Sequence, residues 1–384
     1  MKIFIFILTF LYLGYLFLEK YLINKYRKKF KYVIHVNGIR GKSTTSRLID
    51  AGLRDSGYKV FTKITGTSPR VINTLGEEKE INRKGKPNIK EQIKAIRWAA
   101  KEKADILILE CMAVNPILQY ICENSILKAD ITVITNVRED HLDEMGNTLD
   151  KIATSLANTI PTNGAFFTAD EKYFDFFSKL SNTKNSKSFL SSNKNPIYST
   201  IDFPENVAVA LDVCKYVGIP EEFALNQMKN YKRDPGRLKI LEYINSSKNS
   251  IFFLNALAAN DPNSSELIIN NLKGTEFWNL KKYLLINNRK DRVSRWEQYI
   301  PFVFKFEKDF DYILISGENK ELFYNLVNKN FASKKISILH DKEFFETIDN
   351  DSIIVAVGNI CGHGKKLVDY FEEKGKVIEC QVIS

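Results

Sequence analysis

Residues 33–46, with the sequence VIHVNGIRGKSTTS, constrain the fold of this chain more than any other segment. The β-branched run at 33–36 predicts a strand, and the apolar pattern at 43–56 predicts a helix. A glycine-bearing turn joins them and leads into GKST at 41–44. In such a unit, backbone N–H groups surround a phosphate, the lysine reaches the outer phosphates and a hydroxyl binds Mg²⁺. The segment therefore predicts a site for ATP and Mg²⁺.

The glycine spacing of this loop differs from the usual phosphate-loop pattern. Gly38 lies three residues before Gly41, whereas the usual pattern has its first glycine five residues before, where this chain has Val36. The loop is therefore shorter than in most nucleotide hydrolases of this type. An ordinary glycine-rich turn is the alternative, but the flanking strand and helix favour phosphate binding.

Helices and strands alternate along the rest of the chain, which predicts an α/β fold. A helix is expected over 88–103, strands over 104–109 and 129–135, a surface loop rich in Ser, Asn and Lys over 181–195, and a helix over 203–217. Further strands are expected at 250–254, 283–286, 312–316, 335–339 and 352–357. This alternation indicates a phosphate-loop central domain with a mostly parallel sheet and a smaller, Rossmann-like C-terminal domain.

The length of 384 residues suits two domains, each with its own core. The segment 231–237, YKRDPGR, has the composition of a hinge between them. We predict a transmembrane anchor at 1–23, an ATP-binding central domain at 31–235 and a C-terminal α/β domain at 238–384.

The N-terminus departs from the pattern of a soluble protein. Residues 3–18 are almost wholly apolar and span about 24 Å as a helix, which residues 21–23 extend toward the ~30 Å of a hydrocarbon core. Six basic residues follow between positions 20 and 31, against Lys2 alone before, so the positive-inside rule places both domains in the cytoplasm. A cleaved signal peptide is the alternative, but export would separate the phosphate loop from ATP. We predict an uncleaved single-pass anchor in the cell membrane.

Charge and cysteine usage narrow the partners and the compartment. The net charge of +10 suits nucleotides, an acidic polymer or anionic lipid headgroups. No zinc-finger spacing or RNA-binding aromatic signature accompanies it, so we expect no nucleic-acid partner. The five cysteines are scattered without a CxxC pair, which argues against a disulfide framework or a zinc site and for a reducing cytosol.

Polar residues follow two of the predicted strands. Glu110 and Asn136 stand at strand ends, and the carboxyl ends of parallel strands meet at one edge of a sheet. Glu110 is placed to bind Mg²⁺ or its water, with helix capping as the alternative. His141, flanked by Asp140 and Asp143, could hold a second metal or be simply packed or solvated.

A turn with the sequence TGTSPR occupies residues 65–70. The hydroxyls of Thr67 and Ser68 and the guanidinium of Arg70 could line the site and face an anionic substrate. A plain turn without a role in binding is equally compatible with this composition.

The motifs of this chain resemble those of the Mur ligase superfamily, which forms amide bonds with ATP. In chain order they are NGxxGKST at 37–44, Glu110, N…DHLD at 136–143, PGR at 235–237 and NDPNS at 260–264. Within the superfamily, the apolar N-terminus, KxTGT at 63–67, ECMAVNP at 110–116 and NAxAANDP at 255–262 resemble the ligase subunit of poly-γ-glutamate synthases. The likeness runs from the anchor to near the C-terminus.

This resemblance implies a mechanism and a set of site residues. In the superfamily the γ-phosphate of ATP passes to a carboxylate, and an amine attacks the acyl phosphate to give an amide, ADP and phosphate. The implied nucleotide contacts are Asn37, Gly38, Arg40, Gly41, Lys42, Ser43, Thr44, Asn136, Asn206 and Asn255. The implied catalytic residues are Lys42, His141 and Arg237, with Ser43 and Glu110 holding one Mg²⁺ and His141 a second metal. A solvated hinge charge is the alternative for Arg237.

Three functions remain open at this point. The first is a membrane-tethered ligase that joins glutamate through its γ-carboxyl into poly-γ-glutamate, working with small membrane subunits of a synthase complex. The second is a folylpolyglutamate synthetase-like ligase, against which the anchor argues because folates are soluble. The third is a non-catalytic, nucleotide-gated subunit of a membrane assembly. Glu110, His141 and Arg237 together favour catalysis over this third function.

Overall fold

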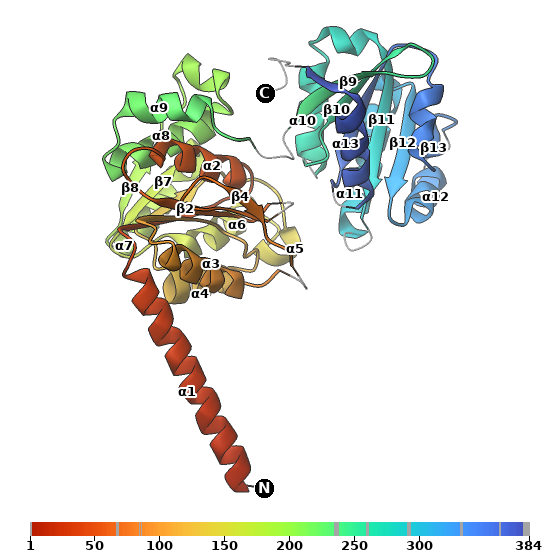
Figure 1. Cartoon of the computed structure of the whole chain (residues 1–384). Helices are drawn as coiled ribbons and strands as arrows, with labels where there is room; N and C mark the ends of the chain where they lie inside the picture. Colours follow the sequence, from red (N-terminus) through yellow and green to blue (C-terminus); the bar gives the residue numbers. More distant parts are fainter. Residues whose placement is uncertain are drawn as a thin grey trace. The chain divides into compact units, whose positions relative to one another are not determined.

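The computed structural model describes residues 2–66, 69–83, 85, 87–233, 238–258, 261–289, 293–330, 333–360 and 362–378. The chain divides into two compact units, Met1–Arg233 and Asp234–Ser384. Each unit is built on one sheet with helices on both faces, as the ribbon in Figure 1 shows. The predicted α/β fold class is therefore confirmed.

The sheet of the first unit has the strand order β4-β3-β2-β5-β1-β6-β7-β8 in the described part of the chain. The strands are β1 Tyr32–Asn37, β2 Val60–Ile64, β3 Arg70–Ile72, β4 Glu78–Glu80, β5 Ile106–Glu110, β6 Ile131–Ile134, β7 Ala165–Thr168 and β8 Lys187–Leu190. All neighbouring pairs from β2 to β8 are parallel, whereas β3 and β4 are antiparallel additions. Because β1 lies between β5 and β6 and is parallel to both, the carboxyl ends of these three strands lie side by side at one edge of the sheet.

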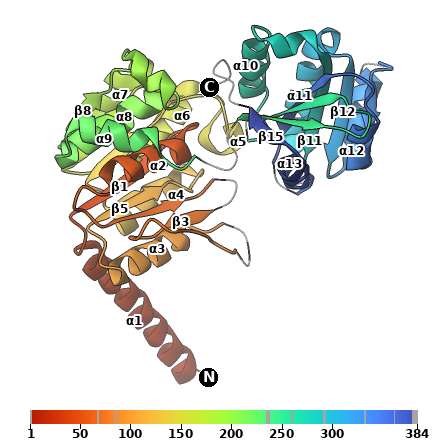
Figure 2. The same ribbon diagram turned by 45° about the horizontal axis from the view of Figure 1, so that its top comes forward.

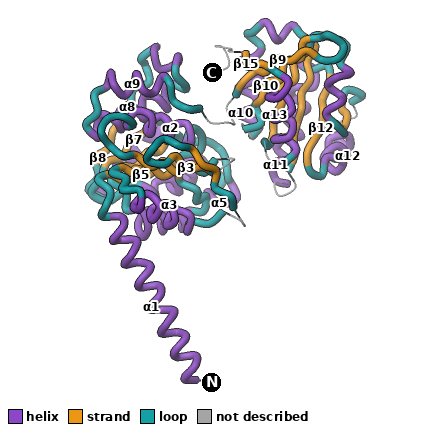
Figure 3. Tube along the Cα trace, in the orientation of Figure 1, coloured by secondary structure: helices purple, strands orange, loops and turns teal. Residues whose placement is uncertain are grey.

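Helices cover both faces of this sheet, as the purple and orange segments of Figure 3 show. The helices on one face are α2 Lys42–Leu53, α8 Pro204–Val217 and α9 Glu221–Lys229. Those on the other are α3 Lys90–Lys101, α4 Pro116–Ile121, α6 Leu149–Leu156 and α7 Glu171–Thr183, with a π-helical turn at Cys122–Leu127 and the short α5 Leu142–Met145 nearby. Alternate apolar residues of each strand supply the two cores: on β1, Val33 faces the α3 side and Ile34 the α2 side.

The first helix, α1 Lys2–Arg27, leaves the unit on the α3 side, as Figures 1 and 2 both show. Its apolar side chains up to Leu18 are exposed, while Ile23 is buried in the core under α3. Within the described residues this is the one helix long and apolar enough to cross a membrane, with limits Ile3–Arg27. A signal sequence satisfies the same criteria, so the membrane anchor stays a prediction.

The sheet of the second unit has the strand order β13-β12-β11-β14-β10-β9-β15 in its described residues. Its strands are β9 Lys239–Ile244, β10 Ser250–Asn255, β11 Lys281–Asn288, β12 Tyr312–Gly317, β13 Ile336–Ile338, β14 Ser352–Gly358 and β15 Lys376–Ile378. Its helices are α10 Pro262–Leu272, α11 Val293–Phe306, α12 Lys320–Asn330 and α13 His363–Lys374. The strands from β13 to β10 are parallel, and β9 and β15 are antiparallel.

The surface loop predicted over 181–195 is wrong in part. Helix α7 continues to Thr183, and β8 forms the edge of the sheet at Lys187–Leu190. Its Phe189 ring stacks on Phe167 of β7 with 4.6 Å between centroids. An edge strand needs few apolar side chains, and its polar composition resembled that of a loop.

Candidate nucleotide and metal site

The phosphate loop lies between the end of β1 and the start of α2. Gly38 has φ 125° and Gly41, the residue before α2, has φ 81° in the left-handed region. The first intrahelical hydrogen bond runs from Thr45 N to Gly41 O at 2.8 Å, so the N–H groups of residues 42–44 point out of the helix end. These donors and the positive end of the helix dipole make an anion site.

Gly38 is required because Thr135, the residue after β6, approaches it closely. A Cβ atom added to Gly38 would lie 2.0 Å from Thr135 Oγ1 and 2.8 Å from Thr135 N. Thr135 in turn donates from Oγ1 to the carbonyl oxygen of Arg40 at 2.5 Å, which holds the middle of the loop. A larger residue would therefore displace both the loop and its support.

We expect Gly38→Ala to abolish tight ATP binding and to destabilise the protein by several kcal/mol. The positive φ alone costs of the order of 1–3 kcal/mol, and the contact with Thr135 adds to it. Gly57→Ala is the matched control. Gly57 likewise has a positive φ, 93°, but no atom lies within 4 Å of a Cβ added to it. Thermal unfolding and titration with a non-hydrolysable ATP analogue measure both effects. Wild-type affinity in Gly38→Ala would contradict the assignment of the loop.

The Lys42 side chain folds back over this loop. Its Nζ donates to Gly38 O at 2.8 Å and to Ile39 O at 3.1 Å. Burial lowers the pKa of Lys42, and the charge of Glu110 opposes that shift. The amino group is thus held over the loop, where the outer phosphates of a bound nucleotide can take the place of the two carbonyls.

Ser43 and Glu110 form a pair of oxygen ligands beside the loop. Ser43 Oγ donates to Glu110 Oε2 at 3.0 Å, and the N–H of Thr65 donates to the same oxygen at 2.8 Å. Glu110 ends β5 and is 2% exposed, so its orientation is fixed by the strand and by these two donors. A hydroxyl and a carboxylate beside a phosphate site suit Mg²⁺, whose other positions are filled by water and phosphate oxygens.

Asn136 supports the loop from the end of β6. Its Oδ1 accepts from Arg40 N at 3.0 Å and its Nδ2 donates to Arg40 O at 3.1 Å. The Arg40 guanidinium donates to Asp140 Oδ2 at 3.2 Å. Because both ends of the Asn136 amide hold the loop backbone, this residue positions the loop, and its direct contact with nucleotide stays a prediction.

His141 lies at the rim of the same site. It has φ 52°, and its Nε2 is 3.7 Å from Asp140 Oδ2. Among the described residues, no group of three or more His, Cys, Asp and Glu side chains is placed to hold a metal ion. The second metal at His141 stays a prediction.

The side chain of Asn37 belongs to a buried polar network. Asn37 is 2% exposed, and its Nδ2 donates to Gln119 Oε1 at 3.0 Å and to Thr159 Oγ1 at 3.2 Å. Gln119 Nε2 continues this buried network to Ser155 Oγ at 3.1 Å. The Asn37 side chain therefore fixes the start of the loop, and a nucleotide contact by this residue stays a prediction.

Asn206 packs against the other end of the loop. Its Oδ1 accepts from Thr45 Oγ1 at 3.3 Å, and a Cβ on Gly41 would lie 2.5 Å from that oxygen. The structure thus brings Asn206 to the loop, as the sequence predicts. Thr44, in the first turn of α2, is half-buried beside it. Nucleotide contacts by Thr44 and Asn206 stay predictions.

Arg70 belongs to an internal ion-pair cluster. Its NH1 lies 3.7 Å from Oε1 of Glu78, a buried carboxylate that also binds Arg47 and, at 3.0 Å, Lys232 Nζ. Burial would raise the pKa of Glu78, but the hydrogen bonds from Arg47 and Lys232 outweigh it and hold that pKa below its ordinary value. Because Glu78 is shared by three cations and the Arg70 Nε has no hydrogen-bond partner among the described residues, the cluster does not use up the charge of Arg70, and its contact with a substrate stays a prediction.

Several predicted site residues lie outside the described residues. These are Thr67, Ser68 and Arg237, together with Asn260 of the NDPNS motif. Their expected roles therefore stay predictions.

The second unit carries buried amides at the carboxyl ends of its parallel strands. Asn255 ends β10 fully buried, and within the described residues its Nδ2 has no hydrogen-bond partner. Asn287 and Asn288 end β11, where Ser316 Oγ donates to Asn287 Oδ1 at 2.8 Å and Asn288 Nδ2 is likewise unpaired. Sequence reasoning missed Asn287 and Asn288, although two asparagines directly after a predicted strand were a usable signal. Nucleotide binding by Asn255 stays a prediction.

Comparison with known proteins agrees with this architecture. Residues 36–226 match the family model of the Mur ligase middle domain, and residues 240–374 match that of the poly-gamma-glutamate synthase CapB C-terminal domain. Capsule biosynthesis protein CapB of Bacillus anthracis is 35% identical over 89% of this chain and 76% of that protein. PGA synthase CapB of Bacillus subtilis is 36% identical over 88% of this chain and 90% of its own length.

Solved structures of similar fold include folylpolyglutamate synthases. The enzyme of Thermotoga maritima is similar with a TM-score of 0.63 at 16% identity, covering 91% of this chain and 92% of that one. The bifunctional folylpolyglutamate synthase/dihydrofolate synthase of Yersinia pestis, complexed with AMPPNP and a Mn ion, has a TM-score of 0.66 at 14% identity, with 91% and 92% coverage. At these identities the likeness shows the fold. With the two CapB relatives and both family models in agreement, the chain belongs to the CapB poly-γ-glutamate synthase family of the Mur ligases.

Proposed function

We propose that this chain is an ATP-dependent amide ligase that joins glutamate units through their γ-carboxyl groups into poly-γ-glutamate at the membrane. The observation that carries the proposal is the pairing of Ser43 with Glu110 directly beside the phosphate loop. The name of the Bacillus subtilis relative, PGA synthase CapB, and the family model matched by residues 240–374 support the product class.

The reaction begins with phosphoryl transfer. A γ-carboxylate oxygen attacks the γ-phosphorus of ATP, the bond to ADP breaks, and an acyl phosphate forms. The N–H groups at the start of α2 and the Lys42 ammonium bind the phosphates and stabilise the charge that spreads over the transferred group. A magnesium ion held by Ser43 and Glu110 would neutralise the β- and γ-phosphate oxygens.

The second step forms the amide. The amine of the next glutamate attacks the acyl carbon, phosphate leaves with the bonding electron pair, and the amine loses a proton. In this step the chain's residues retain the leaving phosphate in the loop while the amine approaches. Arg40 and Asp140, paired at the rim, would orient the loop for both steps.

The membrane setting is part of the proposal. Helix α1 would anchor the chain, with both units in the cytoplasm where ATP is available. One helix forms no pore for a polymer, so small membrane subunits of a synthase complex are the expected partners. The basic charge of the chain suits a polyanionic product.

The acceptor substrate distinguishes this proposal from a folate ligase. We expect membranes containing the full chain and its partner subunits to release phosphate from ATP about tenfold faster with glutamate or short γ-glutamyl chains than with tetrahydrofolate, because the acceptor must complete the site. Chain extension is followed by mass spectrometry. Extension of tetrahydrofolate instead would favour the folate ligase, and tight ATP binding without turnover would favour the nucleotide-gated subunit.

A further inference from the structure

Helix α1 is firmly joined to the first unit. Ile23 is buried under α3, and the Arg27 guanidinium donates to Leu127 O at 2.7 Å and to Lys128 O. Lys128 Nζ reaches back to Asn24 Oδ1 at 3.0 Å. The surface of the unit that surrounds this junction therefore has a defined position relative to α1.

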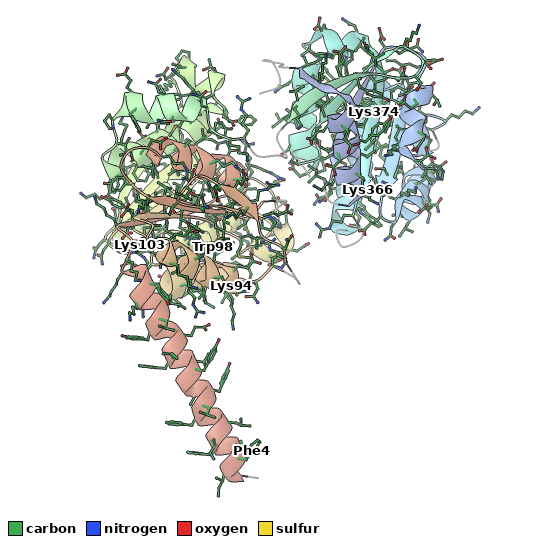
Figure 4. All side chains as sticks on the ribbon, in the orientation of Figure 1. Phe4, Lys94, Trp98, Lys103, Lys366 and Lys374 are labelled. Atoms are coloured by element: carbon green, nitrogen blue, oxygen red, sulfur yellow. The ribbon has the colours of Figure 1, made fainter. Side chains whose placement is uncertain are left out.

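Helix α3 presents a basic face with one aromatic ring beside this junction. Lys94, Trp98 and Lys101 are exposed and share one side of the helix by their spacing, and Lys103 follows the helix end. Figure 4 shows Lys94, Trp98 and Lys103 on the side of the unit from which α1 emerges. The Trp98 ring is 37% exposed and leans on Phe61, with 5.6 Å between centroids. An aromatic ring that is half in protein and half exposed, among lysines, is typical of a membrane interface.

The positive charge of this face is not neutralised by its neighbours. No ion pair joins the amino groups of Lys94, Lys101 and Lys103 to any described residue. The nearby acidic side chains have other partners: Glu102 accepts from Thr74 N at 3.0 Å, and Asp105 accepts from Lys59 N at 2.8 Å. Asp130 likewise pairs with Arg27 at 2.7 Å. Glu102 and Asp105 keep their negative charge, because their donors are neutral backbone N–H groups, but the five exposed lysines at 25, 28, 94, 101 and 103 outnumber them, so the face keeps a net positive charge.

We propose that this basal surface, formed by Lys25, Lys28, Lys94, Trp98, Lys101 and Lys103, binds anionic phospholipid headgroups of the bilayer around α1. This proposal rests on the membrane anchoring proposed above, because α1 brings the basal surface to the lipid. The apolar run of α1 ends in lysines at its carboxyl end, and this end of the helix packs against α3. If α1 spans the bilayer, α3 therefore lies at the level of the lipid headgroups.

Docking through the basal surface orients the site. Helix α1 leads into the amino end of β1 at Tyr32, whereas the phosphate loop follows the carboxyl end of β1 at Asn37. The loop therefore lies at the edge of the sheet away from the junction.

The test uses the full chain in nanodiscs whose lipids are brominated near the headgroup end of the acyl chains, so that they quench shallow tryptophans. The signal of Trp98 is the difference between the wild type and Trp98→Phe. We expect this signal to be quenched in discs containing phosphatidylglycerol, and the quenching to fall at least about twofold when salt rises from 0.1 to 0.5 M.

Charge removal supplies the decisive comparison. Lys94→Gln/Lys101→Gln/Lys103→Gln is expected to lose at least about half of the quenching. The matched control, Lys308→Gln/Lys329→Gln/Lys366→Gln, removes three exposed lysines of the second unit, one of them labelled in Figure 4, and should keep it. Equal thermal unfolding of both variants excludes misfolding.

Three results would overturn the proposal. They are equal quenching in phosphatidylcholine alone, full quenching in the basal triple variant, and a Trp98 response to added poly-γ-glutamate without any response to lipid. Carbonate extraction tests the anchor separately. A chain that resists extraction but shows no lipid-dependent Trp98 signal has an anchor without basal docking. A chain that is extracted yet still binds anionic vesicles through these lysines has the docking surface without the anchor.

Discussion

Replacement of Lys42 by alanine is expected to lower the rate of glutamate-dependent ATP turnover by about 10³-fold or more. The amino group is held over the loop by the carbonyls of Gly38 and Ile39, at 2.8 and 3.1 Å. In the ATP complex, the Lys42 ammonium would contact the γ-phosphate and stay close to it during transfer. Without this ammonium, the transferred phosphoryl group loses the positive side chain that the loop itself supplies. Phosphate release under single-turnover conditions measures the loss.

The control for Lys42→Ala is Lys90→Ala, an exposed lysine at the start of α3 that contacts no part of the loop. It should retain wild-type turnover. Thermal unfolding of Lys42→Ala shows whether the two lost hydrogen bonds affect the fold. A folded Lys42→Ala protein with turnover within twofold of wild type would mean that the loop does not hold the transferred phosphate.

Glu110→Gln is expected to lower turnover by about 10²-fold and to raise the Mg²⁺ concentration needed for half-maximal rate by about tenfold. The amide keeps the shape of the side chain and an oxygen that can accept from Thr65 N, but it removes the negative charge next to Ser43. The change therefore affects the metal more than the fold. Mg²⁺ titrations of the initial rate and thermal unfolding separate the two effects.

Glu80→Gln provides the comparison, since Glu80 is an exposed carboxylate on β4 away from the loop. It should leave the metal requirement unchanged. If Glu110→Gln lost stability while its Mg²⁺ titration matched that of the wild type, Glu110 would be a structural acceptor for Thr65 and Ser43 and not a metal ligand.

The parts of the site that were predictable are local in the sequence. Strand, glycines, lysine and helix follow one another within residues 33–46, so their geometry is set by neighbours along the chain. Glu110 could be placed because a buried apolar strand directly precedes it. A strand end beside a phosphate loop is a position that topology determines.

The parts that were missed depend on distant partners. Asn37 looks like a loop residue, but its hydrogen bonds go to Gln119 and Thr159, which are 82 and 122 residues away. Arg70 looks like a free cation in a turn, but Glu80 lies opposite it in the β3–β4 pair and Glu78 is 3.7 Å from its guanidinium. Neither pairing can be read from spacing, because it arises only when the sheet forms.

Edge strands were the other limit of sequence reasoning. The central strands β1, β5 and β6 and the parallel strands of the second sheet were predicted close to their observed positions, whereas β2 and β7, which are also parallel and internal, were not predicted. The edges at β8 and at β3–β4 are polar and short, which protects an exposed edge from pairing with other chains but removes the apolar pattern that identifies a strand.

Formation of an acyl phosphate is the central claim, and transfer of oxygen isotope tests it most directly. γ-Glutamyl substrate labelled with ¹⁸O in its carboxyl groups is incubated with ATP and membranes that contain the full chain and its partners. If the carboxylate attacks the γ-phosphorus, each phosphate released with amide formation carries one ¹⁸O atom from the substrate. Mass spectrometry of the phosphate should show this singly labelled species in step with chain extension. Unlabelled phosphate accompanying extended chains would contradict the mechanism.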